Sequence, residues 1–244
     1  MNWLRSYGLL VRWSAVRLKY LLPLMLIVQT LLAVGIVIGF AFLIPGIDQQ
    51  TALYLSTGAP ALGLITVGMV LAPQLVAETK TSGTFEYNRT LPVPRSAILA
   101  ADLSIWLVTS LPGLVLSLVV AALRFDLSLR ISAFVVPAVL LVAVTATAVG
   151  YAIAYAAPPS VASLVSQVIV FFALMFSPVN FPADRLPEWL QVVHQFLPIQ
   201  YMADAIRQTL VVPAAGLNPV PFLVLAAWCV FGLAVTLKVM TRRS

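Results

Sequence analysis

Residues 76–102 read VAETKTSGTFEYNRTLPVPRSAILAAD and carry six charged side chains: Glu78, Lys80, Glu86, Arg89, Arg95 and Asp102. On both sides of this stretch the chain is apolar over lengths that can cross a membrane, because a helix needs about 20 apolar residues to span the hydrocarbon core. We therefore expect a polar loop held between two membrane helices. Such a loop is a place where a soluble partner could bind a membrane protein.

The overall composition excludes a soluble globular domain. Hydrophobic residues make up 61% of the 244 residues and charged residues only 9%, with a mean hydropathy of +1.04. Soluble domains carry roughly 25% charged residues, so this chain cannot cover a water-facing surface. Its 17 prolines and 12 glycines are compatible with membrane helices, which tolerate both. The fold class that we predict is an all-α integral membrane protein with a single transmembrane domain.

The net charge of +6 does not indicate nucleic-acid binding. The basic residues lie at the ends of apolar runs, as in membrane proteins, rather than in one patch that could follow phosphates. The single cysteine, Cys229, lies within an apolar run and can form no disulfide inside the chain.

The apolar runs predict six transmembrane helices. We expect them at residues 21–43, 52–76, 98–123, 131–157, 161–176 and 222–239. The charge-free stretch from 131 to 183 is too long for one span. It is divided at Pro158-Pro159, because paired prolines cannot continue a helix.

Residues 1–20 predict an interfacial amphipathic helix before the first span. Arg5, Arg12 and Lys19 are spaced seven apart, so they share one helical face. The alternative is the basic segment of a signal peptide, but the apolar run that follows is longer than the 7–15 residues typical of such peptides.

The distribution of Lys and Arg orients the chain. Six spans place both termini on one side. That side holds Arg5, Arg12, Arg17, Lys19, Lys80, Arg89, Arg95, Lys238, Arg242 and Arg243. The other side holds Arg124, Arg130, Arg185 and Arg207. The positive-inside rule then predicts that both termini and the loop at 76–97 are cytoplasmic, in the cell inner membrane.

Two polar segments are expected to carry local helices. In the cytoplasmic loop, residues 84–90 could form a short helix that starts after Gly83 and ends before Pro92 and Pro94; the alternative is a plain solvated loop. On the other side, residues 177–220 contain two apolar periodic stretches separated by Pro198. Each is only about 11 residues, so they predict a re-entrant or interfacial helical hairpin between spans five and six.

Two pairs of small residues, Gly35 with Gly39 and Ala146 with Gly150, have the spacing that lets membrane helices pack closely. The pairs are compatible with packing inside one chain or with a dimer contact.

Several kinds of chemistry are absent from the sequence. There is no phosphate-binding G-x-x-x-x-G-K-[ST] loop, no H-E-x-x-H metal motif and no G-x-S-x-G nucleophile motif. One histidine and one cysteine exclude the common zinc sites. No charged residue lies in the middle of a span, and Asp102 comes nearest, about one turn inside the third. This disfavours an ion-coupled carrier and an intramembrane hydrolase. The energy for any transport must therefore come from a source other than an ion that moves through these spans.

Two motifs resemble those of type-2 ATP-binding-cassette (ABC) exporter permeases. Glu78, SGTFE at 82–86, LPVPR at 91–95 and Ile98 are similar to the family's E…SGT-[hydrophobic]-E…TPV-x-R…I signature. LPIQYMADAIR at 197–207 is similar to its late LP-x-x-Y…A-x-R segment. The span count, the amphipathic start and the hairpin agree, so the resemblance covers essentially the whole chain.

The resemblance implies a membrane subunit that works with other chains. Two permease chains, identical or different, would dock on two separate ATPase chains, which bind the ATP and Mg²⁺. The loop between spans two and three would carry the coupling helix that contacts the ATPase. That role falls on Glu78, Gly83, Thr84, Glu86, Pro92 and Arg95. The turn at 157–160 would be a second contact, and the hairpin would close the exit. Many members have Gly-Lys after the arginine-isoleucine stretch, where this chain has Ala100-Ala101-Asp102, so the resemblance does not define the charge of the cytoplasmic gate.

The substrate pathway is expected between the two permease chains, lined by the second and fifth spans. Its candidate residues are Phe171, Phe172, Met175 and Phe176, which would suit a hydrophobic or amphipathic substrate, drug-like as in multidrug efflux or lipid-like. The alternative is that these side chains face lipid or a neighbouring span. For the whole chain, the alternative functions are a structural or assembly protein without transport activity and, less favoured, an ion-coupled carrier.

Overall fold

The structure is a computed structural model that describes residues 3–43, 48–84, 92–125, 131–211 and 216–241. Every regular element among them is a helix. The elements are α1 (Trp3–Arg17), α2 (Leu21–Leu43), α3 (Gln49–Thr66), the π-helix η1 (Val67–Leu71), α4 (Ala72–Thr81), α6 (Arg95–Phe125), α7 (Val135–Ala156), α8 (Pro159–Phe176), the 3₁₀-helix η2 (Ala183–Arg185), α9 (Glu188–Phe196), α10 (Pro198–Leu210) and α11 (Val220–Thr241).

Six helices are long and apolar enough to cross a membrane, which confirms the predicted span count. They are α2, the continuous rod of α3, η1 and α4, then α6, α7, α8 and α11. The second span is longer than predicted and runs over Gln49–Thr81. Its start is fixed by Asp48, whose carboxylate accepts a hydrogen bond from the Thr51 backbone N–H at 3.3 Å, as an N-cap residue does.

The fourth span begins at Val135 and not at residue 131. The backbone N–H of Ser132 donates to the Thr209 carbonyl of α10 at 2.8 Å. Residues 131–134 therefore form a turn tied to α10, and the helix starts only after it.

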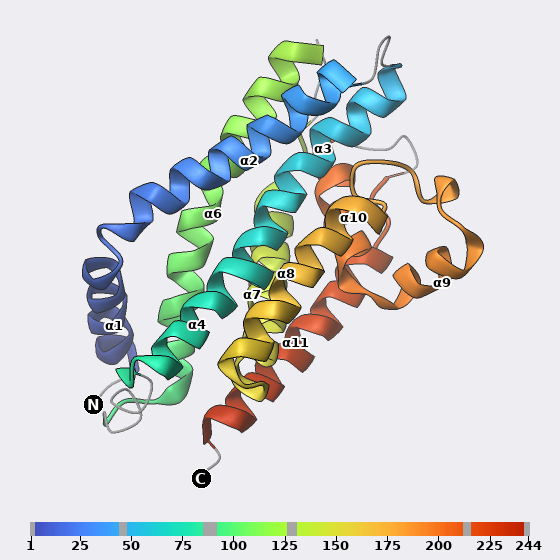
Figure 1. The fold of residues 1–244 in the computed structure, drawn as a ribbon. Helices are drawn as coiled ribbons and strands as arrows, with labels where there is room; N and C mark the ends of the chain where they lie inside the picture. The colour runs from blue at the N-terminus through green and yellow to red at the C-terminus, as the bar shows by residue number, and fades with distance from the viewer. Residues whose placement is uncertain (1–2, 44–47, 85–91, 126–130, 212–215, 242–244) are drawn as a thin grey trace.

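The second span lies at the centre of the bundle (Figure 1). Most of it is buried, whereas α2, α8 and α11 bury only a minority of their residues and form the periphery. Both chain termini lie at one end of the bundle, together with the end of α4 and the start of α6 (Figure 1). We call this the terminal end. The opposite end, the distal end, holds the start of α3 and the end of α6.

The hairpin between α8 and α11 consists of α9 and α10, with unequal arms of 9 and 13 residues. Leu197 separates them in an extended conformation, and Pro198 is the first residue of α10 rather than the separator. The residue before a proline is pushed out of the helical region, which explains this break. α10 packs into the core through Met202, Ala205 and Ile206, while α9 exposes Trp189 and Phe196.

The pair Ala146 and Gly150 packs inside the chain. A Cβ placed at Gly68 of η1 would collide with Ala146, and one placed at Gly150 would collide with the Gly68 carbonyl oxygen. The second and fourth spans thus cross so closely that their backbones touch at Gly68 and Gly150. By contrast, a Cβ at Gly35 or Gly39 would meet no atom within 4 Å.

Candidate functional site

The described residues of the predicted coupling set gather at the terminal end. Glu78 is exposed on α4, which ends at Thr81 with the Ser82 backbone N–H donating to the Glu78 carbonyl at 2.9 Å. Gly83 follows with φ +75°, a left-handed conformation that glycine adopts without strain and that often ends a helix. Thr84 shares a hydrogen bond of 3.0 Å with Ser82. The chain therefore turns sharply after the second span.

The return of the loop is formed by Pro92, which is exposed, and Arg95, the first residue of α6. Glu86 lies outside the described residues, as does the predicted short helix beyond Thr84. The structure thus brings five of the six candidates to one end of the molecule.

Asp102 faces the N-terminal helix. It lines one pocket together with Ser14 and Arg17 of α1 and Tyr151 of α7. Tyr151 in turn accepts a hydrogen bond of 2.8 Å from the Trp106 indole N–H. Asp102 and Arg17, which carry opposite charges, therefore line the same pocket.

Two further contacts dock α1 along α6. The Trp3 indole N–H donates to the Ser96 hydroxyl at 3.1 Å, and the Tyr7 and Ser104 hydroxyls share a hydrogen bond of 2.8 Å. The amphipathic helix predicted at the N-terminus is present, and it is joined to the third span by side-chain hydrogen bonds as well as by apolar contact.

Lys80, which was not among the candidates, makes three hydrogen bonds at the terminal end. Its ammonium donates to the carbonyls of Ala154 at 2.6 Å, Tyr155 at 3.1 Å and Ala157 at 3.1 Å. These carbonyls belong to the end of α7 and to the turn at 157–160. The sequence shows a lysine in the last turn of a helix, which is a common position for a cation. The carbonyls that it binds lie far away in the chain.

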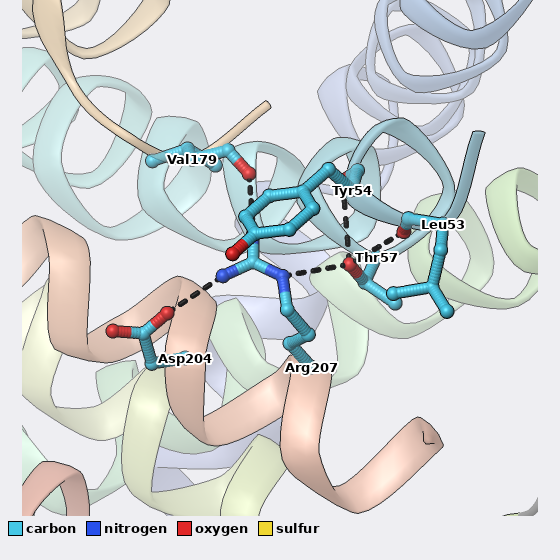
Figure 2. A network of polar contacts seen from close by, with 6 residues as sticks. All are labelled: Leu53, Tyr54, Thr57, Val179, Asp204 and Arg207. Atoms are coloured by element: carbon cyan, nitrogen blue, oxygen red, sulfur yellow. Dashed lines mark hydrogen bonds and ion pairs between the residues drawn. The ribbon is translucent and has the colours of Figure 1, made fainter. Parts of the chain in front are cut away.

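At the distal end, Arg207 of α10 joins three segments (Figure 2). Its guanidinium donates to the Thr57 hydroxyl of α3 at 3.2 Å, to the Asp204 carboxylate at 2.6 Å and to the Val179 carbonyl at 2.6 Å. It also lies over the Tyr54 ring, 4.0 Å from the centroid. We call these residues the distal clasp: Tyr54, Thr57, Val179, Asp204 and Arg207.

The clasp combines charge with burial. Only 12% of the Arg207 side chain is exposed, against 34% of Asp204. Burial raises the pKa of the Asp204 carboxyl, and the Arg207 guanidinium counteracts that rise. An arginine in this place can satisfy several acceptors at once because its donors are fixed in a planar fork.

Next to the clasp, the segment after α8 lies directly on α3. A Cβ at Gly58 would collide with the Val179 carbonyl oxygen and the Asn180 side chain. Asn180 is 3% exposed, and neither its amide nitrogen nor its amide oxygen has a partner among the described residues. The second span and the segment that follows the fifth are thus in close contact at the distal end.

The predicted pathway residues fall on two faces of α8. Phe171, Met175 and Phe176 are exposed on the single chain. Phe172 instead lines an apolar groove of about 490 Å³, together with Met69 of the second span. The candidate pair of spans does meet in this groove, although α7 and α11 also line it.

Next to the groove, His194 of α9 packs on Phe172, while Leu197, Pro198 and Ile199 line the groove on the hairpin side. The imidazole of His194 stacks on Phe172 with ring centroids 5.6 Å apart. Its Nε2 donates to the Phe176 carbonyl at 2.9 Å, since a carbonyl can only accept. Nδ1 is buried without a partner among the described residues, and burial lowers the pKa of His194.

No three His, Cys, Asp or Glu side chains come together to hold a metal ion in the part of the chain that the structure describes. A family model described as "ABC-2 type transporter" matches residues 11–211. No curated protein matches the sequence. The matched range runs from α1 to the end of α10 and includes both the terminal-end residues and the distal clasp.

Proposed function

The chain belongs to the ABC-2 type transporter family as a permease subunit of an ABC transporter, and we propose that it works as an exporter powered by a separate ATPase chain. The ATPase would bind ATP and Mg²⁺ and would contact the terminal end. The permease would carry a hydrophobic or amphipathic substrate, drug-like or lipid-like, out across the inner membrane. Both termini would be cytoplasmic.

One observation carries this proposal: the two expected ATPase contacts lie together at one end. Lys80, next to the loop, binds the carbonyl of Ala157 in the turn at 157–160. At the other end, the distal clasp joins α10 to α3 and to the segment after α8. An ATPase that moved the terminal end could therefore act on the second and fifth spans, which meet again under the clasp.

The apolar groove at Met69 and Phe172 supports the substrate class. Its lining is made almost entirely of aliphatic and aromatic side chains within the span region. Apolar lining with few polar groups suits a hydrophobic ligand. The exposed face of α8 at Phe171, Met175 and Phe176 would meet lipid or the second permease chain, whether identical or different.

The test is co-purification of the tagged chain from native membrane, followed by an assay of ATPase activity. We expect a soluble ATPase in about equal amount, because two permease chains would dock on two ATPase chains. Glu86→Ala should weaken this association and the ATPase activity without affecting membrane insertion. The matched control is Glu188→Ala, which changes an exposed glutamate of α9 at the hairpin.

The rival function is a structural or assembly protein of the membrane. A chain that purifies alone, with no nucleotide-dependent partner, would support that rival. Loss of the ATPase on Glu86→Ala but not on Glu188→Ala would instead support the exporter.

A further inference from the structure

Lys80 connects two parts of the terminal end: the end of α4 with the loop that follows it, and the α7–α8 turn at 157–160. It lies in the last turn of α4, two residues after Glu78 and three before Gly83. Its ammonium reaches across to the end of α7, where it donates to the carbonyls of Ala154, Tyr155 and Ala157. It also lies 5.8 Å from the centroid of the Tyr155 ring.

This contact uses the full hydrogen-bonding capacity of the lysine. An ammonium has three donors, and each has a carbonyl within 3.1 Å. The last carbonyls of a helix have no partner in the helix itself and carry its negative dipole end, so a cation is favoured there. Lys80 is therefore bound to the α7 terminus and is not available as a free charge for a soluble partner.

The segment that Lys80 binds cannot absorb much movement. Pro158 follows directly, and α8 starts at Pro159. Prolines have fixed φ angles, so the connection between the fourth and fifth spans is short and stiff. α4 also packs against both α7 and α8. The end of α4 is thus joined to the start of the fifth span both by direct packing and by the hydrogen bonds of Lys80.

We propose that Lys80 is a positioning residue that makes α4 and the α7–α8 turn move as one body. This inference rests on the proposed function, because the movement would originate at the ATPase contact. The inference adds that the loop is connected mechanically to the fifth span within one chain. The turn at 157–160 would then move with the loop and would not respond to the ATPase separately.

The experiment uses the complex of the full chain with its co-purified ATPase. Spin labels are attached at Ser82→Cys and Ser160→Cys, which are exposed at the two parts of the terminal end, in a Cys229→Ala background. Distances between the labels are measured with ADP and with ATP plus vanadate. In the otherwise unchanged chain we expect one narrow distance distribution in both states, since the two parts move together.

Three variants separate the linking role from simple helix capping. Lys80→Gln should broaden the distance distribution and lower the ATPase activity about tenfold, the scale of one lost charge-assisted hydrogen bond. Lys80→Arg should restore most of both, since it keeps a cation with several donors. Lys238→Gln is the matched control, because Lys238 also lies in the last turn of a span but is exposed at the end of α11.

The outcomes distinguish the two levels of the proposal. If no ATPase co-purifies with the unchanged chain, the proposed function fails. In a second outcome, the unchanged complex hydrolyses ATP while Lys80→Gln keeps both the narrow distance distribution and the ATPase activity. In that case the linking role of Lys80 is wrong and the exporter function stands. A Lys80→Gln chain that only melts at a lower temperature, with coupling intact, also overturns the linking role.

Discussion

At the scale of the single residue, the distal clasp depends on the shape of one side chain. Arg207 reaches a hydroxyl, a carboxylate and a carbonyl from a planar group that also covers the Tyr54 ring. A lysine would keep the charge but has neither the fork nor the planar face. We therefore expect Arg207→Lys to lower the free energy of unfolding by about 2 kcal/mol.

Thermal unfolding of the purified chain in detergent measures this change. Arg185→Lys is the control, because Arg185 is exposed on η2 beside the same hairpin. Equal melting of Arg207→Lys and the unchanged chain would show that the clasp does not depend on the guanidinium.

The single histidine, His194, should make the stability of the folded chain depend on pH. Burial lowers the pKa of His194 below its ordinary value of 6.5, so the folded chain resists the proton that the unfolded chain accepts. The stabilisation is present above the unfolded pKa of 6.5 and is lost as the pH falls below it. Protonated Nδ1 would be a buried donor without an acceptor among the described residues.

His194→Gln tests this dependence, since glutamine keeps a donor for the Phe176 carbonyl but does not titrate between pH 5 and 8. Between about pH 7.5 and pH 5.5 the melting temperature of the unchanged chain should fall more than that of the variant. Parallel curves for the two proteins would exclude His194 as the source.

At the scale of the element, the crossing of the second and fourth spans depends on small residues. Gly150 faces the Gly68 carbonyl so closely that an added methyl group would force the helices apart. Gly150→Ala should therefore cost about 1–3 kcal/mol of stability, as overpacking does. Gly35→Ala is the matched control, since a Cβ there meets nothing within 4 Å. Equal thermal stability of the two variants would contradict the close crossing.

The elements were largely predictable, and their contacts were not. Long apolar runs and the Pro158-Pro159 break predicted the six spans, because length and hydrophobicity determine whether a helix can cross a membrane. The late start of α7 was missed, since it follows from a hydrogen bond between Ser132 and Thr209. The pair Ala146 and Gly150 was found by its spacing, but the sequence did not reveal that Gly68 would be its partner.

The candidate site shows the same division. Motif residues such as Glu78 and Gly83 could be proposed from the sequence because they lie close together in it, and their coupling role stays a prediction. Lys80 and the Tyr54 and Thr57 side of the clasp were not, since each acts on a residue more than 70 positions away. Such contacts depend on how the spans pack, which local patterns do not determine.

At the scale of the whole molecule, the charges predict how the chain sits in the membrane. Among the described residues, seven basic residues belong to α1, the turn after it, the end of α4, the start of α6 and the end of α11: Arg5, Arg12, Arg17, Lys19, Lys80, Arg95 and Lys238. The end of α6 and the segment η2–α10 carry three: Arg124, Arg185 and Arg207. Basic residues near the ends of spans are retained in the cytoplasm. The structure strengthens this argument, because α1, the end of α4 and the start of α6 all lie at the same end (Figure 1).

Single cysteines can report this orientation in intact cells. In a Cys229→Ala background, Ser82→Cys lies at the terminal end, and Gln50→Cys lies in the first turn of α3 at the distal end; both positions are exposed. A membrane-impermeant maleimide should label Gln50→Cys at once and Ser82→Cys only after permeabilisation, because the basic end faces the cytoplasm. A permeant maleimide should label both and serves as the control for reactivity. The reverse pattern would place the terminal end outside, where a cytoplasmic ATPase could not reach the loop, and the exporter proposal would then fail together with the orientation.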